Sequence, residues 1–285
     1  MLGYNKKLFI LPFDHRASFI KGLLGDKTKL SDKDINYLKT EKEIIYAGFK
    51  KGIDLGIPKE EAAILVDEKF GSEILEDARK NSIITLLSVE KSGEEEFVFE
   101  SPDFEDHIRA FSPTFAKVLL HTKSFKEDDS KKRQIEKLKK INDFCKENNI
   151  KFLIEPLVHD QDEISLVNEQ IFIIEELNNN GIEPDVWKLE GSEKRENYEA
   201  ITSSVQKNGR DNVGIIILGG GEDMEKVERI IKTGASVKGV IGFAIGRTIF
   251  WQSLVSLKQG QIREEEAIDK IAKNYFLFYK LFENK

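Results

Sequence analysis

The sequence has one cysteine, Cys145, and only four histidines among its 285 residues. A single cysteine excludes an intrachain disulfide and any metal site built from several cysteines. No apolar run approaches the roughly 20 residues that a membrane-spanning helix needs. The first residues also lack the pattern of a signal peptide. We therefore expect a cytoplasmic protein that does not act at a membrane.

An excess of basic residues is missing as well. The chain has 44 Lys+Arg against 51 Asp+Glu, which gives a net charge of −7 at pH 7. Binding to a nucleic acid backbone requires clustered positive charge, so nucleic acid is not an expected partner. Hydrophobic residues make up 40% of the chain and charged residues 33%, enough for one core under a solvated surface. Residues 1–285 are expected to form one domain, because a (β/α)₈ barrel needs about 250 residues.

Short apolar segments alternate with longer amphipathic ones along the chain. The expected strands are residues 7–13, 62–66, 82–89, 115–121, 151–158, 185–190, 213–218 and 239–245. The expected helices are residues 34–55, 72–80, 104–111, 130–148, 163–178, 193–207, 222–232, a segment from 247, and 264–282, with a small hairpin at 90–100. Continuous apolar strands are typical of a parallel sheet covered on both faces. Eight such units favour a closed TIM barrel, an α/β fold, over an open doubly wound sheet.

The extra C-terminal helix carries apolar residues on most of its sides, among them Ile271, Tyr275 and Phe278. A helix of this kind must bury more than one of its faces against other parts of the protein or against a partner. We expect it to pack on the barrel. A subunit interface, and so a homo-oligomer, is the alternative.

Several polar residues lie where the strands should end, which is where barrel enzymes carry their catalytic groups. Side chains alternate between the two faces of a strand. This alternation directs Lys117, Glu155 and Lys188 into the barrel and places Asp14 and Arg16 at the exit of the first strand. Two lysines and two carboxylates are therefore expected at one barrel mouth.

These residue types suit carbonyl chemistry through a Schiff base. An amine attacks a ketone, and a nearby carboxyl group moves the protons. Lysine has an ordinary pKa of about 10.4, and burial can lower it by about 3–5 units, so a neutral amine is attainable near pH 7. The alternative is a buried lysine that serves only as the ion-pair partner of a neighbouring glutamate.

Glycines and an arginine follow the last two strands. Gly219 and Gly220 follow the seventh strand, and Gly246 and Arg247 follow the eighth. Glycines let a phosphate approach backbone amides, a helix N-terminus adds positive charge, and arginine binds phosphate through paired hydrogen bonds. The pattern predicts a phosphate site, with a flexible turn as the alternative. It matches neither a dinucleotide fingerprint nor a nucleotide P-loop.

A metal site is a weaker alternative. His15, His121 and His159 fall near strand exits and could bind a metal with Asp67 or Glu90. The histidines lack the close paired spacing of zinc motifs, so no metal or other cofactor is expected.

The sequence resembles class I, Schiff-base aldolases of the tagatose-1,6-bisphosphate aldolase type. It is more similar still to the aldolase-like domain (domain of unknown function 2090) at the C-terminus of bacterial 5-dehydro-2-deoxygluconokinases of inositol catabolism. The resemblance covers essentially the whole chain. Its motifs are Phe13-Asp14-His15-Arg16, Leu87-Ser88-Val89-Glu90-Lys91-Ser92-Gly93, Phe152-Leu153-Ile154-Glu155, Pro184-Asp185-Val186-Trp187-Lys188-Leu189-Glu190 and the run from Gly242 to Trp251.

The resemblance implies a lyase with a TIM-barrel fold and no metal. Lys188 would form the imine and Glu155 would shuttle protons, while Asp14, Arg16 and Lys117 would position the substrate. Gly220, Gly246 and Arg247 would hold a phosphate. The implied substrate is 6-phospho-5-dehydro-2-deoxygluconate, cleaved to dihydroxyacetone phosphate and malonate semialdehyde. A tagatose- or fructose-bisphosphate type of aldolase, or a non-catalytic sugar-phosphate-binding relative, is the alternative.

Overall fold

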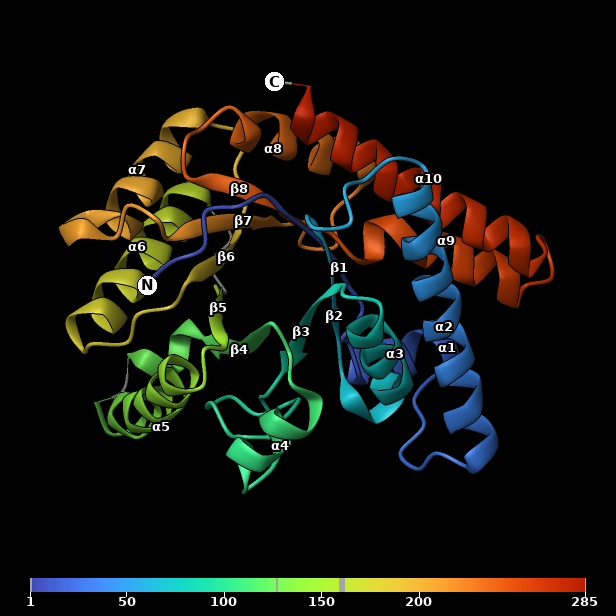
Figure 1. The fold of residues 1–285 in the computed structure, drawn as a ribbon, viewed down its shortest axis with the longest axis horizontal. Helices are drawn as coiled ribbons and strands as arrows, with labels where there is room; N and C mark the ends of the chain where they lie inside the picture. The colour runs from blue at the N-terminus through green and yellow to red at the C-terminus, as the bar shows by residue number, and fades with distance from the viewer. Residues whose placement is uncertain (1, 127, 159–161, 285) are drawn as a thin grey trace.

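The computed structural model describes residues 2–126, 128–158 and 162–284. Parallel strands form a closed barrel in the order β1-β2-β3-β4-β5-β6-β7-β8, and β8 pairs with β1 to complete it (Figure 1). The strands are β1 (Leu8–Pro12), β2 (Ala62–Val66), β3 (Ile84–Ser88), β4 (Phe115–His121), β5 (Lys151–Leu157), β6 (Val186–Glu190), β7 (Gly214–Leu218) and β8 (Val240–Ala244). The predicted (β/α)₈ TIM barrel is confirmed.

Helices surround the barrel (Figure 1). They are α1 (Ala17–Leu24), α2 (Asp32–Asp54), α3 (Glu68–Lys80), α4 (Phe104–Phe111), α5 (Asp128–Glu147), α6 (Glu163–Asn179), α7 (Arg195–Val205), α8 (Met224–Ala235), α9 (Arg247–Lys258) and α10 (Glu264–Glu283), with 3₁₀ helices η1 (Thr122–Phe125) and η2 (Lys207–Gly209). No described helix is both long and apolar enough to cross a membrane.

The expected helices begin within two residues of the observed starts, except for α3, and α1 has no counterpart in the sequence-based expectation. Helix α3 begins at Glu68 rather than at residue 72, because the Asp67 carboxylate caps it by accepting a hydrogen bond from the backbone N–H of Phe70. Helix α1 was not expected at all. It has only eight residues and no side-chain cap, and its buried Phe19 packs against Phe250 and Trp251 of α9. Tertiary packing therefore compensates for weak local helix signals.

The apolar core has two layers. The inner layer fills the barrel and consists of Leu8, Ile10, Ala63, Leu65, Leu86, Phe115, Leu153, Val186, Ile216, Ile241 and Ala244. The outer layer lies between the strands and the helices. At Gly242 on β8, a Cβ would overlap the backbone of Leu8 on β1, so closing the barrel between these strands requires glycine.

Helix α10 packs against α2 and α9, and it buries Ile271, Tyr275 and Phe278. The Tyr275 hydroxyl donates a 2.6 Å hydrogen bond to the backbone carbonyl of Phe9 on β1. The extra C-terminal helix is therefore anchored directly to the barrel, as expected for core packing.

Candidate active site

Three strands each carry a charged side chain two residues after a residue of the inner apolar layer. Lys117 follows Phe115 on β4, and Glu155 follows Leu153 on β5, in each case with one residue between them. Lys188 follows Val186 on β6 in the same way. Because side chains with this spacing share a face, the strand sequences direct all three groups into the carboxyl-terminal end of the barrel.

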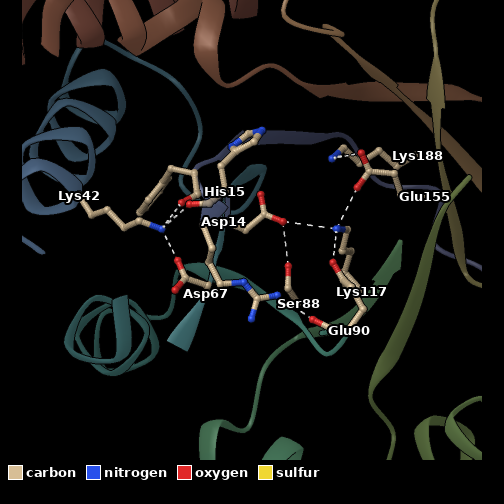
Figure 2. A network of polar contacts seen from close by, with 11 residues as sticks. Asp14, His15, Lys42, Asp67, Ser88, Glu90, Lys117, Glu155 and Lys188 are labelled. Carbon is tan, nitrogen blue, oxygen red and sulfur yellow. Dashed lines mark hydrogen bonds and ion pairs between the residues drawn. The ribbon is translucent and has the colours of Figure 1, made fainter. Parts of the chain in front are cut away.

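Glu155 bridges the two lysines. Its Oε1 lies 2.7 Å from Nζ of Lys188, and its Oε2 lies 3.0 Å from Nζ of Lys117 (Figure 2). The side chains are nearly enclosed, with 7% of Lys188, 1% of Lys117 and 10% of Glu155 exposed. The structure therefore places a buried amine in direct contact with a buried proton acceptor.

Two further carboxylates surround the Lys117 ammonium. Glu90 Oε1 lies 2.7 Å from it and Asp14 Oδ2 lies 3.4 Å from it. The Ser88 hydroxyl donates a 2.8 Å hydrogen bond to the same oxygen of Asp14. Figure 2 shows Lys117 between Asp14, Glu90 and Glu155. The site thus holds two ammonium groups and three carboxylates.

The close contacts change the acidity of these groups. Burial by itself would lower the pKa of Lys117, but the carboxylates of Glu155, Glu90 and Asp14 raise it well above its ordinary value. Burial would raise the pKa of Asp14 and of Glu155, but the neighbouring ammonium groups lower both. Lys117 is therefore a fixed positive charge that keeps Asp14 and Glu155 ionised.

Glu90 and His15 are shifted in the direction that burial dictates. Burial raises the pKa of Glu90, although its contact with Lys117 opposes the change. Burial also lowers the pKa of His15, and the positive charges of Lys188 and Arg247 act in the same direction. At neutral pH the His15 imidazole is therefore uncharged.

A second buried ion pair positions the turn that carries Asp14 and His15. Lys42 on α2 pairs with Asp67 at the end of β2, and both side chains are fully buried. The Lys42 ammonium also donates a 2.6 Å hydrogen bond to the carbonyl of Phe13. This contact fixes the backbone at the exit of β1, next to Asp14.

Arg16 lines the same cavity as Lys117, but its guanidinium is held by other groups. Its guanidinium donates hydrogen bonds of 2.6 Å to the Glu100 carboxylate and 2.7 Å to the backbone carbonyl of Glu90. These contacts attach the β1 exit to the segment after β3, where Glu90 and Phe99 form an antiparallel bridge, in line with the expected hairpin. The substrate-positioning role of Arg16 remains a prediction.

The predicted phosphate-binding residues lie at the same end of the barrel but line different cavities. Gly219 and Gly220 line a cavity of about 670 Å³ beside Glu190. Arg247 lines another of about 650 Å³. His15 lines both this Arg247 cavity and a third cavity of about 330 Å³, which is lined by Lys117, Glu155 and Lys188. The imidazole therefore lies between Lys188 and Arg247.

Gly246 and Gly220 are glycines for different reasons. At Gly246 a Cβ would overlap the carbonyl oxygen of Pro12, so the start of α9 can lie close to β1 only without a side chain. Gly220 has a φ of 60°, a left-handed conformation that glycine adopts without strain. Both positions therefore have a structural reason that is independent of phosphate binding.

The structure does not gather the residues of the metal alternative. Asp67 is paired with Lys42, and Glu90 is paired with Lys117. Within residues 2–126, 128–158 and 162–284, no group of three or more His, Cys, Asp or Glu side chains could hold a metal ion. His159 lies outside the described residues.

Sequence reasoning considered Glu90 only as a metal ligand and gave Ser88 no role in the site. Ser88 and Glu90 follow the inner-layer residue Leu86 at alternate positions, so the argument from alternation could have directed both into the barrel. No comparable local signal connects Lys42 with Asp67, because α2 and β2 meet only in the folded chain.

Solved structures share this fold. An archaeal fructose 1,6-bisphosphate aldolase matches with a TM-score of 0.60 at 14% identity, over 95% of this chain and 94% of that chain. An archaeal fructose-1,6-bisphosphate aldolase whose catalytic lysine is covalently bound to the carbinolamine intermediate matches with a TM-score of 0.59 at 13% identity, over 95% of each chain. A Schiff-base-forming fructose-1,6-bisphosphate aldolase matches with a TM-score of 0.57 at 14% identity, over 94% of this chain and 93% of that chain. At these identities the likeness establishes the barrel fold.

The chain also matches a family model over nearly its full length. The model is described as "Uncharacterized protein conserved in bacteria (DUF2090)", and it matches residues 3–285. This protein therefore belongs to the DUF2090 family.

Proposed function

We propose that the protein is a class I aldolase that cleaves or forms a phosphorylated keto-sugar or keto-sugar acid through a Schiff base on Lys188. The observation that carries this proposal is the 2.7 Å contact between the Lys188 ammonium and Glu155 in the enclosed barrel mouth. The shared fold with Schiff-base aldolases supports it, including one solved with its catalytic lysine bound to a carbinolamine.

The first chemical step requires a neutral amine. The Lys188 ammonium transfers a proton to Glu155, and the free amine attacks the substrate ketone to form a carbinolamine. The protonated Glu155 then returns the proton to the carbinolamine hydroxyl, which leaves as water and generates an iminium ion. Lys117 remains bound to the other carboxylate oxygen and keeps Glu155 in position.

The iminium ion makes the carbon–carbon bond cleavable. The electron pair of the broken bond forms a carbon–carbon double bond at the former ketone carbon, and the iminium nitrogen becomes a neutral enamine nitrogen. The other fragment leaves as an aldehyde when its hydroxyl group loses a proton. The enclosed surroundings of Lys117 and Glu155 limit side reactions of these intermediates.

The phosphate group of the substrate would lie at Arg247. This arginine is the first residue of α9, and the N-terminus of a helix favours an anion. The neutral His15 imidazole, between Lys188 and Arg247, can hydrogen-bond the oxygen that links the phosphate to the carbon chain. Gly220 lines the adjacent cavity.

Two substrate classes fit this proposal. The resemblance to the kinase-fused domains favours 6-phospho-5-dehydro-2-deoxygluconate, which would yield dihydroxyacetone phosphate and malonate semialdehyde. A tagatose or fructose bisphosphate is the alternative. Both classes carry a ketone next to a phosphorylated carbon, which matches the placement of Lys188 and Arg247.

Borohydride trapping tests the proposal. The wild-type protein is incubated with dihydroxyacetone phosphate and sodium borohydride, digested, and examined by mass spectrometry. We expect a reduced adduct on Lys188, no adduct in Lys188→Met, and no effect of EDTA. A screen of phosphorylated keto-sugars for release of triose phosphate then identifies the substrate. Calorimetric binding of these sugars with neither an adduct nor cleavage would instead support a non-catalytic sugar-phosphate-binding protein.

A further inference from the structure

We propose that Glu90 is a further catalytic residue of this site, whose carboxylate takes the proton from the substrate hydroxyl that becomes the aldehyde during carbon–carbon cleavage. This inference rests on the proposed function and assigns a step that Glu155 does not perform.

The free oxygen of Glu90 is the first support. Glu90 lines the catalytic cavity together with Lys117, Glu155 and Lys188. Its Oε1 accepts a 2.7 Å hydrogen bond from Lys117, whereas its Oε2 is buried and has no hydrogen-bond partner among the described residues. A buried carboxylate oxygen without a partner is costly. A substrate hydroxyl bound in the cavity would satisfy it.

The backbone around Glu90 is held firmly. The N–H of Lys91 donates a 2.8 Å hydrogen bond to the carbonyl of Val98, and the N–H of Glu100 donates a 2.9 Å hydrogen bond to the carbonyl of Val89. The Arg16 guanidinium holds the Glu90 carbonyl itself. The Glu90 side chain therefore projects toward Lys117 from a fixed position, as a catalytic base requires.

The carboxylates of Glu155, Asp14 and Glu90 have different surroundings, which suit them to different proton-transfer roles. Glu155 contacts two ammonium groups, which makes it a weaker base. Oδ2 of Asp14 already accepts hydrogen bonds from the Ser88 hydroxyl and the Lys117 ammonium. The Glu90 carboxylate forms its ion pair with Lys117, and burial raises its pKa. Neighbouring carboxyl groups with pKa values shifted apart take different proton-transfer roles.

The bond between the carbon beside the iminium and the hydroxyl-bearing carbon breaks, and its electron pair neutralises the iminium ion to give the enamine. The hydroxyl oxygen forms the aldehyde C=O and transfers its proton to Oε2 of Glu90. Lys117 keeps its own proton throughout and stabilises the charge on Glu90 before the transfer.

Glu90→Gln separates this step from Schiff-base formation. The assays are borohydride trapping on Lys188, exchange of deuterium into dihydroxyacetone phosphate, and cleavage of 6-phospho-5-dehydro-2-deoxygluconate and of fructose 1,6-bisphosphate. Trapping and exchange involve no aldehyde-forming hydroxyl, so we expect both to remain at the wild-type rate. We expect cleavage to fall by about 100-fold or more, the usual contribution of a general base.

Glu95→Gln is the matched control, because Glu95 lies exposed in the same hairpin and its replacement changes the charge equally. We expect wild-type rates in all assays for this variant. Unchanged cleavage in Glu90→Gln would overturn the inference. An equal fall in trapping, exchange and cleavage would also overturn it, because Glu90 would then act only by positioning Lys117. Absence of a Lys188 adduct in the wild-type protein would instead overturn the proposed function, and this inference with it.

Discussion

Replacing Lys117 by methionine should destabilise the protein in a strongly pH-dependent way. The Lys117 side chain is 1% exposed and lies 2.7, 3.0 and 3.4 Å from the carboxylates of Glu90, Glu155 and Asp14. Removing one partner from a buried ion pair typically costs about 3–5 kcal/mol. Lys188 still pairs with Glu155 in the variant, so Glu90 and Asp14 are the carboxylates that lose their ammonium partner. We expect the free energy of unfolding at pH 7 to fall by that amount.

The sign of the pH dependence follows from the carboxylates. In the wild type the pKa of Asp14 and of Glu155 is lowered, so both stabilise the fold above about pH 4, and this contribution is lost as the pH falls through their folded values. Without Lys117, burial raises the pKa of Asp14 and of Glu90. The variant then gains stability on acidification, by up to about 1.4 kcal/mol per pH unit for each carboxylate that takes up a proton.

Urea unfolding of both proteins between pH 4 and pH 8 measures this difference. We expect the gap between wild type and Lys117→Met to be largest near pH 7 and to shrink toward pH 4. Lys132→Met is the control, because Lys132 is exposed on α5 and its replacement should leave stability nearly unchanged at every pH. A gap that stays constant with pH, or a variant as stable as the wild type at pH 7, would refute the reasoning.

The remaining predictions concern the phosphate region and the barrel closure. Arg247→Gln should raise KM for phosphorylated ketoses at least about tenfold in a cleavage assay, with the melting temperature unchanged, because the exposed guanidinium packs little in the core. Gly246→Ala should lower the free energy of unfolding by about 1–3 kcal/mol in urea, because its methyl group would overlap the Pro12 carbonyl; wild-type stability would contradict this. Tyr275→Phe should cost about 1 kcal/mol in the same assay, because it removes the hydrogen bond to the Phe9 carbonyl without creating a cavity.

The architecture could be predicted because its signals are local. Buried parallel strands need continuous apolar runs, and each run is short enough to recognise directly in the chain. The same local rule, alternation of side chains along a strand, directed Lys117, Glu155 and Lys188 into the barrel. Helix α1 was missed because its short segment lacks a side-chain cap and depends on contacts made only in the folded protein.

The site depends on contacts between residues far apart in the chain. The Arg16 guanidinium could reach a substrate or another part of the protein, and only the fold shows that it binds Glu100 and the backbone of Glu90. The same applies to Arg247, which the fold places in a different cavity from Gly219 and Gly220. No spacing in the sequence encodes these distances.

The sequence by itself determined the barrel and the inward direction of its charged side chains, because apolar periodicity and strand alternation are properties of consecutive residues. Only the tertiary structure decided which charges touch. It set Glu155 between two lysines and left Oε2 of Glu90 without a hydrogen-bond partner in the part of the chain that the structure describes. The reason is that acidity and hydrogen bonding depend on distances of a few ångströms between strands that meet at the barrel mouth.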